Sequence, residues 1–378
     1  MSDYRIISAD SHVVEPTDLW TNRIAPEFKD KAPRIVRTDD GGDFWHCENK
    51  NLLGVAFAGA QVGRRFEDPE NLSQQDVFEN VRPGGYIPEE HVKDMDIDGI
   101  DMSIIYPSLG LMLYRVVDSE LLTAIFKAYN DWMADFCNTN PKRLKGIAML
   151  NIDNVRVGVK ELERCANMGF VGAMITDIPT ESRRYFLPEY DALWAAAQDL
   201  EMPLSLHGAT NRGTNPGPMP TPSGDHDGGS AAFQCNFDMY VRISLTDMIF
   251  NGVFERFPKL RIGAIEQQLA WAPFFLDRID YNYEQRALGM TGYRFKDDMK
   301  PSDMFHRNVF IGFQDDALGI QMRDIIGVDL LQWGSDYPHQ ESTFPRSREV
   351  LDEILADCTD EEKAKIASGN ATSIYRLD

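Results

Sequence analysis

Eight short apolar runs recur along the chain, each rich in β-branched residues. They span residues 5–12, 102–108, 144–150, 172–177, 203–208, 261–267, 309–314 and 330–337. Continuous apolar runs of this length are typical of strands that are buried on both faces, as in a parallel sheet. The pattern therefore predicts eight parallel strands.

The segments between these runs carry apolar residues at spacings of three and four, the period of a helix with one buried face. The clearest helical segments are 119–136, 154–168, 187–201, 238–250 and 346–356. Strands that alternate with helices in this way predict an α/β fold, a (β/α)₈ TIM barrel formed by residues 1–378 as a single domain. No GxGxxG motif follows the first strand, which removes the main signal for a dinucleotide-binding sheet.

Two segments interrupt the alternation. Residues 17–95 separate the first two strands and are far longer than one helix with its turns, so we expect an insertion that caps the barrel mouth. Residues 209–229 follow the fifth strand and are rich in Gly and Pro. Such a loop could be a lid over the substrate or simply mobile. His226 within it could belong to a second metal site, but a solvated turn is the simpler interpretation.

The 378-residue chain has a net charge of −22, with 60 acidic and 38 basic side chains. This surface would repel nucleic acid and anionic membranes, so we expect neither as a partner. No apolar segment is long enough to span a bilayer, and the N-terminus does not resemble a signal peptide. The five cysteines are far apart and odd in number, which favours reduced thiols and a cytoplasmic location. We also expect a homo-oligomer.

Polar side chains cluster at the carboxyl ends of the predicted strands, which form the active-site face of such a barrel. The first strand ends in Asp10-Ser11-His12, the fifth in His207 and the eighth in Asp336. Residues two apart on a strand point the same way, so Asp10 and His12 should face the same side. Together the four side chains predict a site for one divalent cation, Zn²⁺, Mn²⁺ or Fe²⁺, which accept such mixed nitrogen and oxygen donors.

From these residues the sequence resembles the amidohydrolase superfamily, and more narrowly its amidohydrolase-related branch of aminocarboxymuconate semialdehyde and γ-resorcylate decarboxylases. The motifs that carry the resemblance are ADSHVVEP at 9–16, LHG at 206–208, WGSDYPHQES at 333–342 and GNATSIYRL at 369–377. The resemblance implies one metal ion held by the same four residues. A bridging carbamate is disfavoured, because the fourth strand ends in Thr176-Asp177 without a lysine.

Three functions remain open. The first choice is hydrolysis of an ester, thioester, lactone or amide by a metal-activated water. Asp336 would take the proton of that water, Glu266 or His339 would return it, and Tyr106 would bind the oxyanion or the metal. Hydrolysis is slightly favoured because the first strand reads DxHxxE rather than the ExH of the decarboxylases. The second choice is nonoxidative decarboxylation of an aromatic or unsaturated acid, with Asp336 protonating the carbon. The third is an inactive barrel that serves as a binding or scaffold protein.

The predicted insertion and strand ends are rich in aromatic residues, which favours a small-molecule substrate with an apolar or aromatic group. The residues concerned are Trp45, Phe57, Phe66, Tyr86, Tyr106 and Trp333. A satellite hydrophobic core is an equally good interpretation of those in the insertion. Arg64, Arg65 and Arg212 are the basic residues nearest the predicted mouth and could hold a substrate carboxylate.

Overall fold

The computed structural model describes residues 4–39, 41–73, 75–212, 235–286 and 294–377. Its central sheet has eight strands in the order β1-β5-β6-β7-β8-β9-β10-β11, and every paired neighbour is parallel. Their bounds are β1 (Ile7–Val13), β5 (Met102–Pro107), β6 (Leu144–Met149), β7 (Gly172–Ile175), β8 (Leu204–His207), β9 (Ile262–Ile265), β10 (Val309–Phe313) and β11 (Leu331–Trp333). Each overlaps one predicted apolar run, and β1 extends one residue beyond its run. The prediction of an eight-stranded α/β barrel is confirmed.

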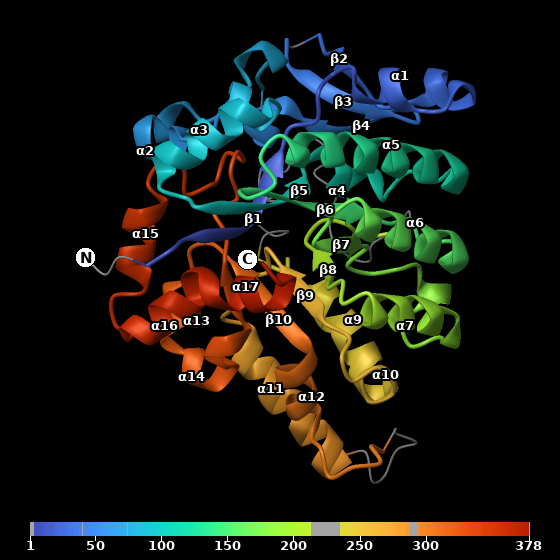
Figure 1. Ribbon diagram of the computed structural model, residues 1–378, viewed down its shortest axis with the longest axis vertical. Helices are drawn as coiled ribbons and strands as arrows, with labels where there is room; N and C mark the ends of the chain where they lie inside the picture. Colours follow the sequence, from blue (N-terminus) through green and yellow to red (C-terminus); the bar gives the residue numbers. More distant parts are fainter. Residues whose placement is uncertain (1–3, 40, 74, 213–234, 287–293, 378) are drawn as a thin grey trace.

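Helices surround the central strands (Figure 1). Those of the barrel are α4 (Leu109–Leu113), α5 (Ser119–Asn138), α6 (Val155–Asn167), α7 (Asp191–Asp199), α9 (Met239–Phe250), α10 (Val253–Arg256), α11 (Ala272–Tyr281), α12 (Pro301–Asn308), α13 (Ala317–Gln321), α14 (Arg323–Ile326), α15 (Ser347–Ile354), α16 (Asp360–Ala364) and α17 (Asn370–Tyr375). The apolar face of α5 is buried because Leu122, Ile125, Tyr129 and Met133 recur at helical spacing. Asp118 caps this helix by accepting the N–H groups of residues 120 and 121.

The barrel closes where β1 meets the end of β11. The N–H of Asp336 donates to the carbonyl of Asp10 (2.9 Å), and the N–H of His12 donates to the carbonyl of Tyr337 (2.5 Å). The hydroxyls of Ser8, Ser11 and Ser335 form a buried cluster across the same seam, with Oγ–Oγ distances of 2.7 to 3.3 Å. This closure fixes two predicted metal ligands, Asp10 and Asp336, side by side.

The segment between β1 and β5 forms a small antiparallel sheet of β2 (Arg34–Arg37), β3 (Asp43–Cys47) and β4 (Lys50–Gly54), flanked by α1 (Leu19–Arg23), α2 (Arg64–Glu67) and α3 (Pro88–Asp98). The sheet lies beside α1 and α5 at the edge of the molecule (Figure 1). Two shorter stretches of the same segment, around Phe57 and Gly85, reach the mouth of the barrel. The carbonyl of Gly85 accepts the N–H of Val14 (2.7 Å), and that of Phe57 accepts the N–H of Gln340 (3.2 Å).

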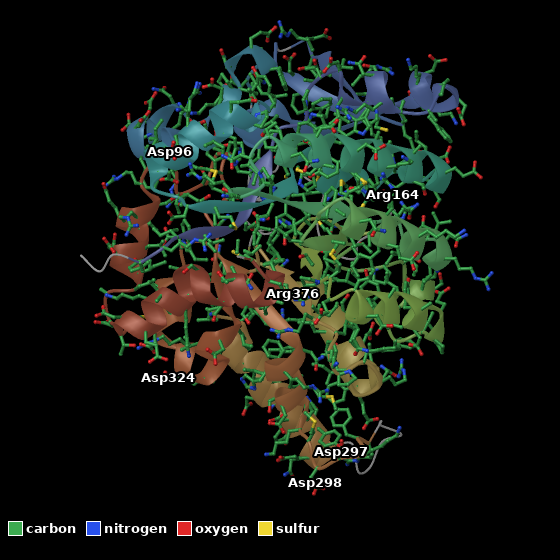
Figure 2. All side chains as sticks on the ribbon, viewed as in Figure 1. Asp96, Arg164, Asp297, Asp298, Asp324 and Arg376 are labelled. Carbon is green, nitrogen blue, oxygen red and sulfur yellow. The ribbon has the colours of Figure 1, made fainter. Side chains whose placement is uncertain are left out.

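Many charged side chains lie on the outside of the molecule. The labelled carboxylates Asp96, Asp297, Asp298 and Asp324 are all exposed at its periphery (Figure 2). Within the described part of the chain, no helix is both long and apolar enough to cross a membrane. Residues 213–234, and with them His226 and most of the predicted loop 209–229, lie outside the described residues.

Candidate metal centre

Four buried side chains meet at the carboxyl end of the barrel. Nε2 of His12 lies 3.2 Å from Oδ1 of both Asp10 and Asp336, and Nε2 of His207 lies 3.4 Å from Oδ1 of Asp10. None of the four side chains is more than 2% exposed. The structure therefore brings together all four residues that the sequence offers as metal ligands.

Both histidines present the same nitrogen to this cluster. Nδ1 of His12 lies 2.8 Å from the carbonyl of Pro107, and Nδ1 of His207 lies 3.1 Å from the carbonyl of Gly208. A carbonyl can only accept a hydrogen bond, so each Nδ1 carries a proton, and Nε2 is the nitrogen that offers a lone pair when the ring is neutral. Histidines that bind metals are commonly oriented by such a second hydrogen bond.

The atoms that face one another are unpaired. Both carboxylate oxygens of Asp10 and of Asp336, and Nε2 of His12 and His207, are buried without a hydrogen-bond partner among the described residues. Leaving so many buried polar atoms unpaired is costly in free energy unless something else satisfies them. Two carboxylates and two imidazoles are suitable donors for a transition-metal ion. A single divalent ion fits here: ligand atoms of Asp10, His12 and His207 lie within 4.8 Å of one another, and His12 also belongs to an adjoining group with Asp336 and His339.

The electrostatics of the cluster favour a cation. Burial alone would lower the pKa of His12, but Asp10 and Asp336 reverse this and raise it well above its usual value. Burial alone would raise the pKa of Asp336, but His339 and His12 outweigh it and the pKa is lowered. The carboxylates thus create a negative potential at the histidine nitrogens, which attracts positive charge.

Local backbone geometry places several of these groups. Asp336 and Glu266 both have φ of 58°, in the left-handed region that non-glycine residues rarely adopt. Such strain is concentrated at functional sites. A Cβ at Gly334 would come within 2.4 Å of the Asp10 Cβ, so only glycine allows β11 to approach β1 this closely. The approach holds Asp10 beside Asp336.

Two glutamates extend the cluster outward. Carboxylate oxygens of Glu266, Asp336 and Glu341 lie within 4.8 Å of one another, and Oε2 of Glu266 lies 3.5 Å from Nδ1 of His207. Burial, followed by the charge of Asp336, raises the pKa of Glu266 well above its usual value. The same two causes raise the pKa of Glu341 to about 7. Both shifts favour the protonated, uncharged form of these carboxyl groups.

His339 lies directly behind Asp336. Its Nδ1 is 2.8 Å from Oδ1 of Asp336, its Nε2 is 2.8 Å from the hydroxyl of Ser108, and its ring stacks on His12 with centroids 4.0 Å apart. The ring of Phe57 lies 5.3 Å from the His339 ring. His339 thus holds the Asp336 carboxylate toward the cluster.

Tyr106 lies below the cluster, with its ring 5.0 Å from the ring of His207. Its hydroxyl is hydrogen-bonded to the hydroxyls of Ser205 (2.7 Å) and Tyr375 (3.3 Å). Burial raises the pKa of Tyr106 well above its usual value, so it is a neutral phenol. In the structure the hydroxyl of Tyr106 is hydrogen-bonded to Ser205 and Tyr375, whereas the sequence analysis expected it to bind the metal or the oxyanion.

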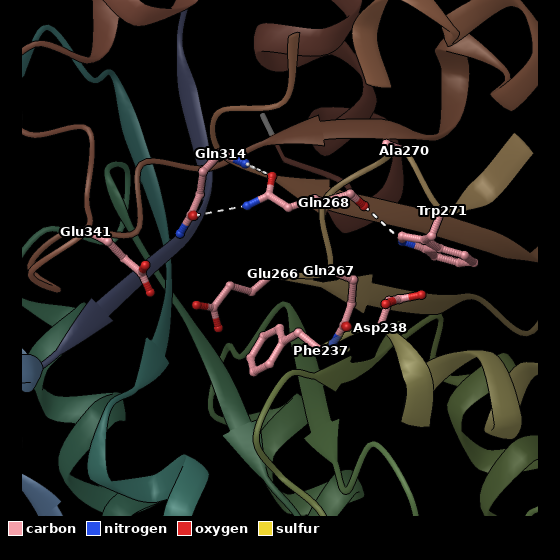
Figure 3. A pocket seen from close by; sticks show the side chains of 9 residues that line it. All are labelled: Phe237, Asp238, Glu266, Gln267, Gln268, Ala270, Trp271, Gln314 and Glu341. Carbon is pink, nitrogen blue, oxygen red and sulfur yellow. Dashed lines mark hydrogen bonds between the residues drawn. The ribbon is translucent and has the colours of Figure 1, made fainter. Parts of the chain in front are cut away.

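A cavity of about 240 Å³ adjoins Glu266 (Figure 3). Its walls are Phe237, Asp238, Glu266, Gln267, Gln268, Ala270, Trp271, Gln314 and Glu341. None of these described lining residues is a lysine or an arginine. The cavity thus joins two aromatic rings and several polar groups to the edge of the metal cluster.

Most of the predicted aromatic lining lies elsewhere. Trp45 packs against Trp20 in the core, and Tyr86 packs against Phe78 beside a satellite cluster that contains Val14 and Val55. Of the aromatic residues in the insertion, Phe57 is the one that reaches His339. The satellite-core interpretation fits Tyr86.

The predicted basic residues are paired with carboxylates. Arg64 lies 3.3 Å from Asp76, Arg65 lies 3.0 Å from Asp315, and Arg212 pairs with Asp153. The expectation that one of them is free to hold a substrate carboxylate therefore lacks support.

The residues that border the site and that the sequence analysis missed include Phe237, Trp271, Gln314 and Glu341. Gln314 closes the predicted seventh strand, so the rule that singled out the other strand ends could have found it. Glu341 lies within the quoted motif at 333–342. Phe237 and Trp271 lie beyond strand ends, where no residue pattern marks them.

The chain is similar to curated decarboxylases over most of its length. It is 26% identical over 339 residues to a gamma-resorcylate decarboxylase of Rhizobium sp. (strain MTP-10005), covering 83% of this chain and 96% of the relative. It is 24% identical over 307 residues to a gamma-resorcylate decarboxylase of Polaromonas sp. (strain JS666), covering 77% and 88%.

Solved structures support the same fold. An amidohydrolase from Mycobacterium avium subsp. paratuberculosis matches with a TM-score of 0.77 at 20% identity, over 99% of this chain and all of the other. A 5-carboxyvanillate decarboxylase from Sphingomonas paucimobilis matches with a TM-score of 0.69 at 21% identity, over all of both chains. A dihydroxybenzoic acid decarboxylase from Polaromonas sp., solved with manganese and 2-nitroresorcinol, matches with a TM-score of 0.64 at 18% identity, over 99% and 97%.

The curated relatives overturn the first choice of the sequence analysis, hydrolysis. Both are decarboxylases, and they support the alternative instead. The preference for hydrolysis rested on the DxHxxE pattern, but both oxygens of Glu15 accept backbone N–H groups, from Leu109 and Gly110, at 2.9 Å. Glu15 therefore anchors the start of α4. The sequence profile of the amidohydrolase family matches residues 17–377, and the chain belongs to that family of metal-dependent enzymes.

Proposed function

We propose that this protein is a metal-dependent, nonoxidative decarboxylase of a small aromatic carboxylic acid. The observation that carries the proposal is a buried set of unpaired carboxylate and imidazole donors beside a 240 Å³ cavity that has two aromatic side chains in its walls. This volume is below the range of about 300–1,000 Å³ that is usual for drug-sized ligands, so a single ring is a suitable occupant. The names of the relatives support the same reaction.

Asp10, His12, His207 and Asp336 would hold the ion. Manganese is the first metal to test, because a dihydroxybenzoic acid decarboxylase of this fold was solved with it. When bound, the ion would fix the substrate carboxylate and an adjacent hydroxyl and stabilise negative charge on their oxygens. His339 keeps Asp336 turned toward this position, since its Nδ1 lies 2.8 Å from Oδ1.

The chain must place one proton on the ring carbon that loses CO₂. Glu266 lines the cavity and lies 3.5 Å from His207, so it faces both the ring and the metal cluster. Burial raises the pKa of its carboxyl group and so favours the protonated form. We assign the proton to Glu266. The sequence analysis expected Asp336 to be the proton donor, but the pKa of Asp336 is lowered. Variants of the two residues, described below, distinguish the two assignments.

The charges around the cavity orient the substrate. Glu266, Glu341 and Asp238 line it, whereas Arg64, Arg65 and Arg212 are each paired with an aspartate. A substrate carboxylate therefore has no cationic partner among the described residues that line the cavity and is best placed at the metal. The rings of Phe237 and Trp271 then provide apolar surface for the substrate ring.

The test is to load purified protein with Mn²⁺, Zn²⁺ or Fe²⁺ and incubate it with 2,6-dihydroxybenzoate, 5-carboxyvanillate and further hydroxybenzoates. We expect products that have lost CO₂, measured by mass spectrometry. Asp10→Asn should abolish this turnover together with bound metal, because it removes a charged ligand. His91→Gln is the matched control, since His91 is equally buried but belongs to α3.

Two outcomes would contradict the proposal. Products that have gained water would show that the reaction is hydrolysis. A protein that binds no metal in any of the three solutions would support the inactive scaffold instead.

A further inference from the structure

Gln314 is a buried polar residue that the proposed chemistry does not yet use. It follows β10 at the mouth of the barrel, lines the cavity and is 6% exposed. The indole N–H of Trp333 donates to its backbone carbonyl (3.0 Å), which fixes the position of the main chain.

The orientation of the Gln314 side-chain amide follows from its neighbour. The backbone N–H of Gln314 can only donate, so the Gln268 atom 3.4 Å away is the acceptor Oε1. The other end of the Gln268 amide is then Nε2, which donates to Oε1 of Gln314 (3.5 Å). The free end of Gln314 is therefore its NH₂ group.

This NH₂ group has no hydrogen-bond partner among the described residues. Figure 3 shows it directed toward the space between Glu341 and Glu266. Gln268, which sets its orientation, has a left-handed backbone with φ of 56°. A strained residue thus holds a buried donor toward the cavity next to the metal cluster.

We propose that Nε2 of Gln314 recognises the substrate by donating a hydrogen bond to an uncharged acceptor on the ring, such as an ether, carbonyl or hydroxyl oxygen. This inference rests on the proposed function, because it requires a ring in the cavity with its carboxylate at the metal. The described lining of the cavity contains no lysine or arginine to pair with an anionic acceptor, which favours an uncharged one. A donor with no protein partner favours ligands that satisfy it over ligands of equal shape that do not.

The test measures binding without turnover. Mn²⁺-loaded protein is titrated calorimetrically with 2-nitrophenols that carry a methoxy or an ethyl group at each remaining ring position in turn. The nitro group has the shape of a carboxylate and cannot leave as CO₂. At one position we expect the methoxy compound to bind about 10-fold tighter than the ethyl compound, because only methoxy accepts a hydrogen bond.

Gln314→Met should remove this preference, and Gln314→Glu should make hydroxyl preferred over methoxy, since a carboxylate accepts where the amide donated. Gln332→Met is the matched control: Gln332 is fully buried with an unpaired amide, but it does not line the cavity. It should leave the preference unchanged.

The proposal is overturned if no compound binds, if wild-type protein shows no preference, or if Gln314→Met keeps it. Failure of the proposed function looks different. In that case the methoxy preference persists in wild-type protein, while hydroxybenzoates release no CO₂.

Discussion

Replacing Gly334 by alanine should disrupt the metal cluster without touching any ligand. The added Cβ would lie 2.4 Å from the Cβ, 2.8 Å from the N and 2.9 Å from the Cα of Asp10. Two of these three atoms are backbone, so β1 and the end of β11 must move apart. Overpacking of this kind typically costs about 1–3 kcal/mol of unfolding free energy.

The displacement also separates Asp10 from Asp336, which are joined by a backbone hydrogen bond of 2.9 Å. Disturbing the support of a metal ligand typically lowers metal affinity by about 10- to 100-fold. We therefore expect Gly334→Ala to need at least about 10-fold more Mn²⁺ for half-saturation, measured by Mn²⁺ titration with electron paramagnetic resonance. Thermal unfolding of the metal-free protein would report the stability loss separately.

Gly369→Ala is the control for this experiment. Gly369 has helical dihedrals, with φ of −60°, and the nearest atom to an added Cβ would be 3.4 Å away. It should be neutral or slightly stabilising, because alanine favours a helix over glycine. Wild-type Mn²⁺ affinity in Gly334→Ala would refute the claim that the close approach of β11 to β1 positions the metal ligands.

Three further results are expected. His207→Ala should lose bound Mn²⁺, measured by elemental analysis after gel filtration, while His91→Gln keeps it; full occupancy in His207→Ala would exclude it as a ligand. Glu266→Gln should retain Mn²⁺ but lower kcat by at least about 100-fold, as expected for loss of a general acid. If Glu266→Gln kept near wild-type kcat and Asp336→Asn lost most of it, Asp336 would be the proton donor instead. Burial lowers the pKa of His91 to about 4 from 6.5. The unfolded state therefore binds more protons at this residue between these values, and the contribution of His91 to the free energy of unfolding should fall by roughly 3 kcal/mol as the pH falls from 6.5 to 4. Denaturant titrations of wild-type protein and His91→Gln across this pH range test this. If the reasoning is wrong, the difference between their free energies of unfolding will not change with pH.

The barrel could be predicted because its strands are buried on both faces and therefore appear as apolar runs in the sequence. The four metal-cluster residues could be predicted because parallel strands bring their carboxyl ends to one face, whatever the details of packing. The seam between β1 and β11 could not, since it depends on how closely Gly334 approaches Asp10.

The cavity was harder to predict than the cluster. Phe237 and Trp271 come from segments that follow strands, and their direction is set by tertiary packing rather than by a sequence period. Aromatic residues in the insertion looked equally suitable as cavity lining, yet Trp45 packs against Trp20 in the core. The pairing of Arg65 with Asp315 likewise joins residues 250 positions apart. The choice between hydrolysis and decarboxylation could not be made from the ligands, since both reactions use the same donor set.

The most direct test of the account is the fate of the solvent atoms during turnover. Mn²⁺-loaded protein should be given a hydroxybenzoate substrate in parallel in D₂O and in H₂¹⁸O, with products analysed by mass spectrometry and NMR. The account predicts a product that lacks the carboxyl group, carries one deuterium on the carbon that held it, and contains no ¹⁸O. A product that retains this carboxyl group, or a new carboxyl oxygen derived from H₂¹⁸O, would contradict decarboxylation.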